Sequence, residues 1–389
     1  MNQEKQVYIS SVGFTNVGEH WNESIAQLAM SAITDVLDGT SIDQFDHIFV
    51  GNMMSSVISQ QHNVGSFIAD YCGFNGVPVV TIESAGSSGA TAFHQAVLSI
   101  LSGQINTALV LGVEKMTDSI GSSIYDVMSV GSDNDWELFH GVTLSGIAGL
   151  IMRRYMYQHN ISNELFANFS INAHNNGANN SNAMFRNKIN LERYLQANIV
   201  ASPMNILDCA PDADGACAIV LTNECIEFSP GNHIRVAASN MSNSVLPLHD
   251  RSDILIFDAA HNSANMAYHE AGINAAQVDV AEIYDQFSIY AAMSLEACGF
   301  VQEGNGVDLA NQGGIDINGV IPISTFGGLK SRGNPGGATG VYQIAEIALQ
   351  LAGLAGVNQV RDPQWALAQC LGSSGGTAVT HILEKINIK

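Results

Sequence analysis

Short β-rich runs alternate with helical patterns along the first third of the chain. The runs are QVYISSVGF, HIFVGNM, VPVVTIES and TALVLGVEK, and the helical patterns between them cover residues 24–37, 61–71 and 87–102. A strand followed by a helix and a further strand is the pattern of a doubly wound α/β layer with parallel strands. We therefore expect a layered α/β fold in this part of the chain.

The same order returns from about residue 253 to the end. Helical patterns at residues 262–271, 288–298 and 338–351 alternate with the runs VDVAEIYDQF, VIPIST, WALAQCLG and VTHILEK. A duplicated α/β unit explains why both halves have the same layered order. Two unrelated α/β domains are the alternative, because the halves share a pattern rather than an obvious sequence.

The segment between the two halves, up to about residue 201, lacks this regular alternation. It is polar and rich in Asn and Ser, with one helical pattern at residues 150–158. Long insertions in compact domains commonly carry functional loops. We expect this segment to cover a site rather than to build the core.

The charge balance excludes several classes of partner. The chain has 389 residues, with 14 Lys and Arg against 36 Asp and Glu, so its formal net charge is -22. Such a surface repels nucleic-acid phosphates and anionic membranes. No apolar run is long enough to span a bilayer, and the first residues show no leader pattern. We predict a cytoplasmic protein that binds neither nucleic acid nor a membrane.

The cysteines and histidines show no ligand pattern. The six cysteines lie far apart without a CxxC pair, and the histidines have no metal-ligand spacing. This distribution argues against a disulfide framework and against a zinc site. We predict reduced, mostly buried thiols and no metal.

Small residues gather in three turns at predicted strand ends. These are ESAGSSGATAF at 83–93, GGLKSRGNPGGATGVYQ at 327–343 and QCLGSSGGTAV at 369–379. Glycine and serine before a helix let backbone N–H groups face a ligand, and ligands of open α/β sheets bind beyond the carboxyl ends of strands. Tight turns and close helix packing favour the same residues, so each turn alone is ambiguous.

The three turns belong to a longer series of motifs. The others are GNMMSS at 51, GVEKMTD at 112, NAHNNG at 172, ILDCAPDADGACAIVL from 206 and VAEIYDQF at 280. In this order and spacing the series resembles the thiolases, and most of all their archaeal and sterol-carrier-protein branch, over essentially the whole chain. The resemblance implies an α/β thiolase fold, with duplicated βαβαβαββ halves in five layers and an inserted loop domain.

The resemblance also implies boundaries and partners. Residues 1–118 and 202–245 are expected to form the N-terminal half, 119–201 the loop domain over the substrate, and 246–389 the C-terminal half. A homodimer and an acyl-CoA substrate are expected, with no covalently bound cofactor. Relatives in this branch often work with a small zinc-ribbon and OB-fold protein, so we expect such a partner here.

The chain departs from the thiolase pattern at its reactive positions. The nucleophilic cysteine falls on Gly86, and the activating histidine of the GHP turn falls on Asn334. A glycine cannot carry an acyl group, and an amide cannot serve as a base. The residue that holds the enolate-binding water falls on Tyr284, whereas the second cysteine is kept as Cys370.

The remaining groups suit carbon–carbon chemistry beside a thioester that is bound without a covalent link. Tyr284 and Cys370 are the expected acid–base residues, and Asn334 is expected to orient the carbonyl. The N–H groups of Gly86 and Gly372 are expected to hold the thioester oxygen. An aldol or retro-aldol step needs no acyl-enzyme. Sterol-carrier-like relatives without the cysteine are aldolases that use two tyrosines, which fall on Tyr284 and Asn334.

Several histidines are candidates for substrate contact. His62, His140 and His174 fall in segments that face the cavity in related acyltransferases, and a buried structural histidine is the alternative for each. His140 is a catalytic candidate too, because some aryl C-acylating relatives place a histidine nearby. Phe287 and Ser87 are further expected contacts, and Ser87 lacks the adjacent base that a serine nucleophile needs.

Scarce cations must gather around the phosphates of CoA in so acidic a protein. The candidates lie in the expected loop domain and in the turn beside it: Arg153, Arg154, Arg186, Lys188, Lys330 and Arg332. Solvated or intramolecularly paired charges are the alternative for each of them.

Two further functions stay open. The first is a catalytically silent thiolase-like subunit of a multi-enzyme complex, which would also lack a nucleophile and its activator. The second is an acyltransferase in which an aromatic acceptor attacks the bound thioester directly.

Overall fold

The N-terminal half of the chain forms a mixed sheet in the order β3-β2-β4-β7-β1 in a computed structural model, which describes residues 5–118 and 129–386. β2 is parallel to β3 and β4, whereas β7 is antiparallel to both β4 and β1. The strands are β1 (Tyr8–Phe14), β2 (His47–Gly51), β3 (Val79–Ile82), β4 (Thr107–Glu114) and β7 (Gly215–Thr222).

The C-terminal half repeats this arrangement with β8 (His233–Asn243), β9 (Val280–Glu282), β10 (Trp365–Gly372) and β11 (Thr377–Ile386). β10 is parallel to β9 and antiparallel to β11, which is antiparallel to β8. The run VIPIST, predicted as a strand, contributes only a parallel bridge between Ile323 and Ala281 of β9. Counted from that edge inward, the order and directions match those of the N-terminal half, which confirms the predicted duplication.

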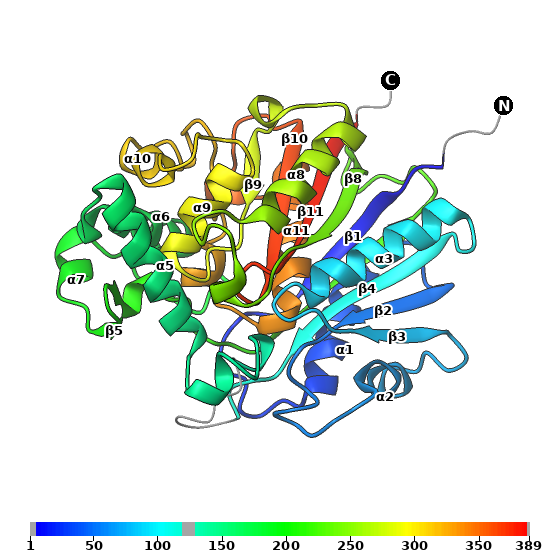
Figure 1. Ribbon diagram of the computed structural model, residues 1–389. Helices are drawn as coiled ribbons and strands as arrows, with labels where there is room; N and C mark the ends of the chain where they lie inside the picture. Colours follow the sequence, from blue (N-terminus) through cyan, green and yellow to red (C-terminus); the bar gives the residue numbers. More distant parts are fainter. Residues whose placement is uncertain (1–4, 119–128, 387–389) are drawn as a thin grey trace.

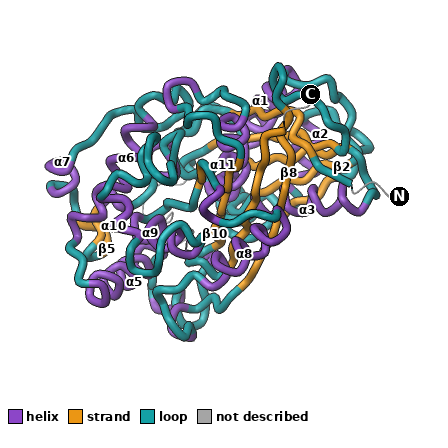
Figure 2. Tube along the Cα trace, turned by 90° about the horizontal axis from the view of Figure 1, so that it is seen from above, coloured by secondary structure: helices purple, strands orange, loops and turns teal. Residues whose placement is uncertain are grey.

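Helices separate and cover the two halves of the sheet, as Figures 1 and 2 show. α1 (Ile25–Asp38) and α2 (Val64–Tyr71) cover the outer face of the N-terminal strands. α3 (Ser88–Ser102) and α11 (Thr339–Leu351) lie in the middle, and α8 (Asp258–Ala271) and α9 (Ser288–Ala297) pack outside the C-terminal strands. The predicted five layers are confirmed.

β4 shows how the sequence builds these layers. Its side chains alternate between two cores: Leu109 and Leu111 pack with α1 and α2, whereas Ala108 and Val110 pack with α3 and α11. A strand buried on both faces reads as a continuous apolar run, because successive side chains point to opposite faces.

Glycines let the two central helices cross at close range. A Cβ atom built on Gly89 of α3 would lie 2.7 Å from the carbonyl oxygen of Gly337, and one on Gly340 of α11 would lie 2.6 Å from the backbone nitrogen of Ala90. Side chains at these positions would push the helices apart. The N-terminal ends of α3 and α11 are therefore neighbours, and the candidate site lies there.

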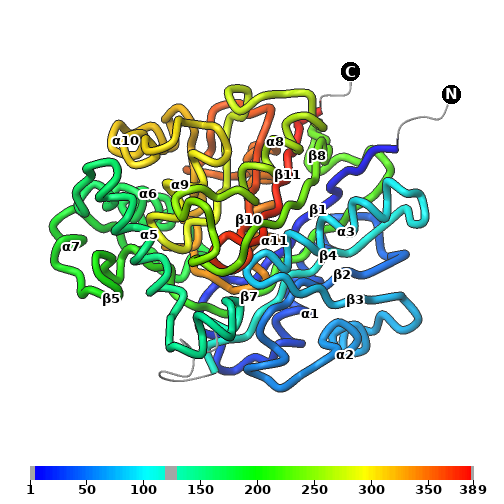
Figure 3. Tube along the Cα trace, in the orientation of Figure 1, coloured from blue at the N-terminus to red at the C-terminus, as the bar shows by residue number. Residues whose placement is uncertain are grey.

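The segment between the two halves forms a helical lobe, coloured green in Figure 3. It contains α5 (Leu144–His159), α6 (Ala167–Gly177), α7 (Leu191–Leu195) and a small sheet of β5 (Ile199–Ala201) with β6 (Met204–Asn205). α5 confirms the helix predicted there, but α6 was not predicted. Residues 119–128 of the expected loop domain lie outside the described residues.

α6 forms in spite of its Asn-rich sequence because tertiary bonds hold it. The amide of Asn172 donates to the carbonyls of Ile315 and Ile323, and that of Asn176 donates to the carbonyl of Ser324. These bonds fix the lobe to the loops of the C-terminal half, including α10 (Gly306–Asn311). Within the described part of the chain, no helix is long and apolar enough to cross a membrane.

Candidate active site

The space beside Gly86 is filled by the side chain of Tyr284. Gly86 lies just before α3, and a Cβ atom built on it would lie 2.2 Å from the Tyr284 hydroxyl oxygen and 2.9 Å from the carbonyl oxygen of Leu371. Tyr284 follows β9 and is 2% exposed. A phenol hydroxyl therefore lies at the N-terminal end of α3, where the thiolase resemblance placed the nucleophilic sulfur.

The Tyr284 hydroxyl is a proton donor. Burial raises its pKa well above the ordinary value, and the neighbouring Cys370 adds to the rise. The phenol therefore stays protonated at neutral pH. Among residues 5–118 and 129–386, none forms a hydrogen bond with this hydroxyl.

Cys370 lies on the other side of Gly86. Its Sγ donates a hydrogen bond to the carbonyl oxygen of Gly86 at 3.3 Å. Burial raises the pKa of this thiol, although the charge of Arg332 opposes the rise. Cys370 is therefore a thiol rather than a thiolate and can only give up a proton to a stronger base.

The expected open oxyanion pocket at Gly86 and Gly372 needs correction. A Cβ atom on Gly372 would lie 2.8 Å from the carbonyl oxygen of Ser84 and 2.9 Å from the hydroxyl of Ser87. That hydroxyl donates to the Ser84 carbonyl at 2.7 Å, so the turn satisfies Ser87 internally. Both glycines are packed tightly because close backbone contacts surround them.

Asn334 is fully buried and keeps one donor free. Its Oδ1 accepts a hydrogen bond from the hydroxyl of Thr339 at 2.9 Å. Its Nδ2 has no partner among the described residues. The backbone of Asn334 pairs with the segment around Asp212: its N–H donates to Pro211 at 3.0 Å, and its carbonyl accepts from Ala213 at 3.1 Å.

Asp212 is a functional candidate that the sequence reasoning missed. Its carboxylate forms no hydrogen bond or ion pair with any described residue, and burial raises its pKa to about 6. Its charge also contributes to the raised pKa of Tyr284. The signal was its place in the quoted segment CAPDADGAC, a carboxylate after a proline in a turn between buried strands.

A pocket of about 600 Å³ opens between the helical lobe and the C-terminal half. Its walls are largely apolar, with Phe287 and Lys330 as the most deeply buried lining residues. Asp212 and Gln286 also line it. Gly86, Tyr284, Asn334 and Cys370 are not among the lining residues, so the pocket and the cluster around Gly86 are separate, with Asp212 next to both.

Of the predicted cations, Lys330 and Lys188 line this pocket, and so does Arg193, which was not predicted. Lys188 and Arg193 are exposed, whereas Lys330 is buried and donates a hydrogen bond from Nζ to the carbonyl oxygen of Asp208. Burial lowers the pKa of Lys330. The other lobe arginines, Arg153, Arg154 and Arg186, are exposed away from the lining.

The expected substrate contact of Arg332 needs correction. Its side chain is 1% exposed and forms an ion pair with Glu346 of α11, with 2.9 Å between Nε and Oε1. The guanidinium also lies over the ring of Tyr342, 4.9 Å from its centroid. Because its charge is paired inside the middle layer, Arg332 is not available to a CoA phosphate.

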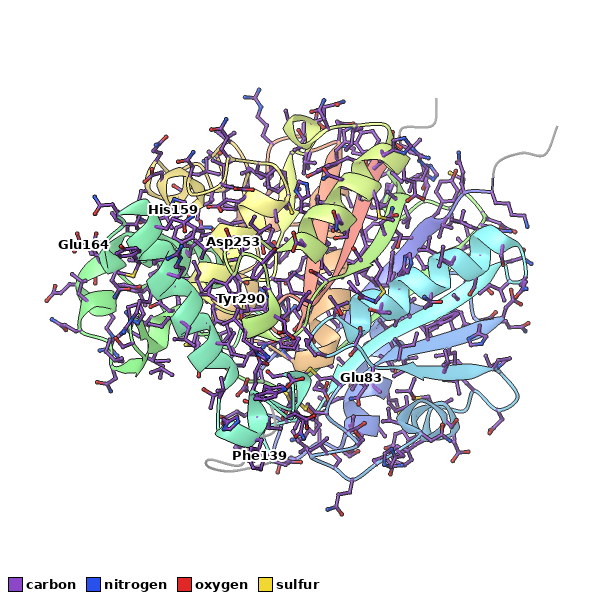
Figure 4. The ribbon with its side chains drawn as sticks, viewed as in Figure 1. Glu83, Phe139, His159, Glu164, Asp253 and Tyr290 are labelled. Atoms are coloured by element: carbon purple, nitrogen blue, oxygen red, sulfur yellow. The ribbon has the colours of Figure 1, made fainter. Side chains whose placement is uncertain are left out.

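The three candidate histidines differ in position. His174 lines the pocket, with Nδ1 3.2 Å from the carbonyl of Asn187, and burial lowers its pKa, so it is neutral. His62 and His140 are exposed and do not line the pocket, which corrects the expectation that they face the substrate. The ring of His140 contacts Phe139, which lies at the edge of the molecule in Figure 4. In residues 5–118 and 129–386 no cluster of side chains suits a metal ion.

Two family models match the chain. Residues 7–224 match the thiolase N-terminal domain, and residues 241–385 match a domain described as thiolase C-terminal domain-like. Among solved structures, one titled "Ltp2-ChsH2(DUF35) aldolase" superposes with a TM-score of 0.82 at 20% identity, covering 98% of both chains. Human mitochondrial 3-ketoacyl-CoA thiolase superposes with a TM-score of 0.72 at 16% identity, covering 98% of this chain and 99% of the other.

Sequence relatives agree with this assignment. An acetyl-CoA acetyltransferase of Methanothermobacter thermautotrophicus is 34% identical over 98% of this chain and 100% of its own length. The benzoylsuccinyl-CoA thiolase subunit BbsB of Thauera aromatica is 30% identical over 90% of both chains. Human sterol carrier protein 2 is 30% identical over 79% of this chain and 59% of its own length. The chain therefore belongs to the thiolase family.

Proposed function

We propose that this protein makes or breaks a carbon–carbon bond beside an acyl-CoA thioester by an aldol or retro-aldol step, without an acyl-enzyme. The observation that carries the proposal is the Tyr284 hydroxyl in the volume that a side chain at position 86 would occupy. Because Gly86 has no atom to acylate, the acyl group stays on CoA. The thioester is then activated only by hydrogen bonds and proton transfer.

The buried cluster supplies donors for such a step. In the retro-aldol direction, the electron pair of the Cα–Cβ bond moves onto the thioester and forms an enolate. The protonated Tyr284 donates a hydrogen bond to the enolate oxygen, and the thiol of Cys370 supplies the proton that Cα takes up. The free Nδ2 of Asn334 orients the carbonyl.

The pocket supplies the recognition of the thioester. Lys188 and Arg193 are exposed along it and attract the phosphates of CoA, whereas Phe287 and the other apolar walls suit the acyl chain. The relative named acetyl-CoA acetyltransferase points to an acyl-CoA substrate, and the structural neighbour titled an aldolase shows that this fold accommodates aldol chemistry.

A homodimer and a small zinc-ribbon and OB-fold partner belong to the same proposal. β3 is the outermost strand of the N-terminal half, and Val80 at its centre is 39% exposed. An open edge of this kind pairs readily with a second strand. The structural neighbour is titled as a complex with a DUF35 protein, which supports the search for a similar partner.

A silent subunit is the second candidate, and one observation favours it. Gly86, Tyr284 and Cys370 do not line the pocket, so a thioester bound there must displace or reach past Gln286 and Phe287 to meet them. The two candidates differ in turnover, since a silent subunit binds the thioester and releases no product.

A panel of CoA esters tests the proposal. The protein, alone and with a candidate DUF35 partner, is incubated with β-hydroxyacyl-CoA and β-ketoacyl-CoA esters, and products are separated by chromatography. The proposal expects a shortened acyl-CoA and a free aldehyde or ketone from hydroxyacyl esters. Binding of the esters without any product, with and without the partner, favours the silent subunit. Cleavage of ketoacyl esters alone contradicts the aldol step.

A further inference from the structure

Three polar groups from three separate loops have no partner within the described part of the chain and lie close together. They are the carboxylate of Asp212, the hydroxyl of Tyr284 and Nδ2 of Asn334. A buried polar group without a hydrogen bond costs about 1–3 kcal/mol. Folded proteins satisfy nearly all such groups, so three together mark a place that a bound molecule completes.

Backbone bonds hold Asp212 in place from both sides. The N–H of Ala210 donates to the carbonyl of Gln286 at 2.8 Å, and the residues on either side of Asp212 pair with the backbone of Asn334. Both partners belong to the C-terminal half. A carboxylate on so restrained a segment keeps its position when substrate binds.

The position of Asp212 matches a missing function. Asn334 stands where the thiolase resemblance places the activating histidine, and its amide cannot take up a proton. Asp212 is its backbone neighbour and, unlike Asn334, lines the pocket. A base that is absent at one position is thus present on the adjoining segment.

The surroundings of Asp212 keep it basic enough to act. Burial raises its pKa to about 6, so the carboxylate is ionised at neutral pH and is a stronger base than an exposed one. Lys330 and His174 line the same pocket, and Cys209 and Tyr284 both feel the charge of Asp212. The pKa of Cys209 is raised to about 12, mainly by burial, and Tyr284 stays protonated, so Asp212 is the base among these neighbours.

We propose that Asp212 is the general base of the reaction and takes the proton from the β-hydroxyl group of a β-hydroxyacyl thioester. The O–H electron pair then forms the new C=O bond, the Cα–Cβ bond breaks, and its pair moves to the thioester as an enolate. Cα takes a proton from Cys370, and the proton on Asp212 returns to that thiolate or to water. The inference rests on the proposed function, which it deepens by naming the base and the substrate group that it contacts.

Turnover and binding are measured separately in the full-length protein with its partner. The pH profile of kcat/KM with a β-hydroxyacyl-CoA is recorded for the wild type, Asp212→Asn, Asp212→Glu and the exposed control Asp250→Asn. Binding is measured with two unreactive CoA thioethers, one carrying the β-hydroxyl and one lacking it.

We expect kcat/KM to fall about 10²- to 10⁴-fold in Asp212→Asn, with partial recovery in Asp212→Glu and no change in Asp250→Asn. The wild type loses activity below about pH 6, and Asp212→Asn has no such limb. The wild type prefers the hydroxylated thioether about 5- to 10-fold, and Asp212→Asn loses that preference.

The outcomes separate the two proposals. A wild type that turns over the substrate while Asp212→Asn keeps its rate and acidic limb overturns the role of Asp212 and leaves the proposed function standing. A wild type without turnover overturns the proposed function. Equal binding of the two thioethers to the wild type overturns the contact between Asp212 and the hydroxyl, whatever the turnover.

Discussion

The open pocket and the buried cluster around Gly86 use polar groups in opposite ways. Along the pocket, Lys188 and Arg193 are exposed and charged, and the walls are apolar. Around Gly86, Tyr284 and Cys370 are buried and neutral, because burial raises both pKa values. The contrast indicates that recognition of the thioester and transfer of protons are assigned to different regions, with Asp212 as the residue adjacent to both.

The largest expected effect concerns the buried cluster. Tyr284→Phe removes the hydroxyl beside Gly86 and is expected to lower kcat by about 10²- to 10⁴-fold with little change in KM. Tyr290→Phe is the matched control, since Tyr290 is also buried and its hydroxyl has no partner among the described residues. Figure 4 shows Tyr290 in the interior. Equal losses in both variants would contradict a special role of Tyr284.

Arg332 tests whether the middle layer holds a structural cation. Arg332→Met leaves Glu346 buried without its partner and is expected to lower the free energy of unfolding by about 3–5 kcal/mol. Urea denaturation measures the loss, with the exposed Arg154→Met as control. Unchanged stability together with weaker binding of CoA esters would return Arg332 to the substrate site.

A double-mutant cycle tests the packing of Gly86 against Tyr284. Gly86→Ala places a Cβ atom against the Tyr284 hydroxyl and is expected to cost about 1–3 kcal/mol of stability. Part of this loss is recovered when Tyr284→Phe is added, because the closest contact is removed. Additive free energies of unfolding in the cycle would show that the two residues do not touch.

Asp212 is expected to trade stability for function. Its pKa is raised from 3.8 to about 6 in the folded chain, so the folded state holds the proton more tightly than the unfolded one. The free energy of unfolding therefore falls as pH rises through this window, and Asp212→Asn is expected to gain about 1 kcal/mol at neutral pH. The gain should vanish below about pH 4, and a gain independent of pH would contradict the burial of an ionised carboxylate.

The smallest expected effect concerns the pocket. Arg193→Ala removes an exposed cation from the lining and is expected to weaken binding of CoA esters about 3- to 10-fold, more at low salt than at high salt. Calorimetric titration measures this, and Arg154→Ala is the matched control outside the lining. Identical affinities would mean that the phosphates of CoA bind elsewhere.

Most of the fold could be predicted because apolar periodicity and glycine-rich turns are local signals. The helix predicted at 87–102 is α3, and the one at 338–351 is α11, each within one residue. α6 could not be predicted, since its asparagines form a helix only when Asn172 and Asn176 bond to loops far along the chain.

The candidate site was harder to predict because burial depends on partners distant in sequence. Tyr284 was identified from its motif, but its occupation of the space at Gly86 emerges only in three dimensions. Arg332 and Lys330 are close in sequence, yet one pairs with Glu346 and the other lines the pocket. Asp212 became a candidate because its pairing with Asn334 brings a carboxylate to an apolar wall.

The most direct test of the central claim is the intact mass of the protein during turnover. The wild type is mixed with an equimolar acyl-CoA substrate, quenched at short times and analysed by mass spectrometry, while the small products are quantified in the same samples. The account predicts product formation with the mass of the polypeptide unchanged at every time. A transient mass gain equal to the acyl group, in step with product formation, would contradict it.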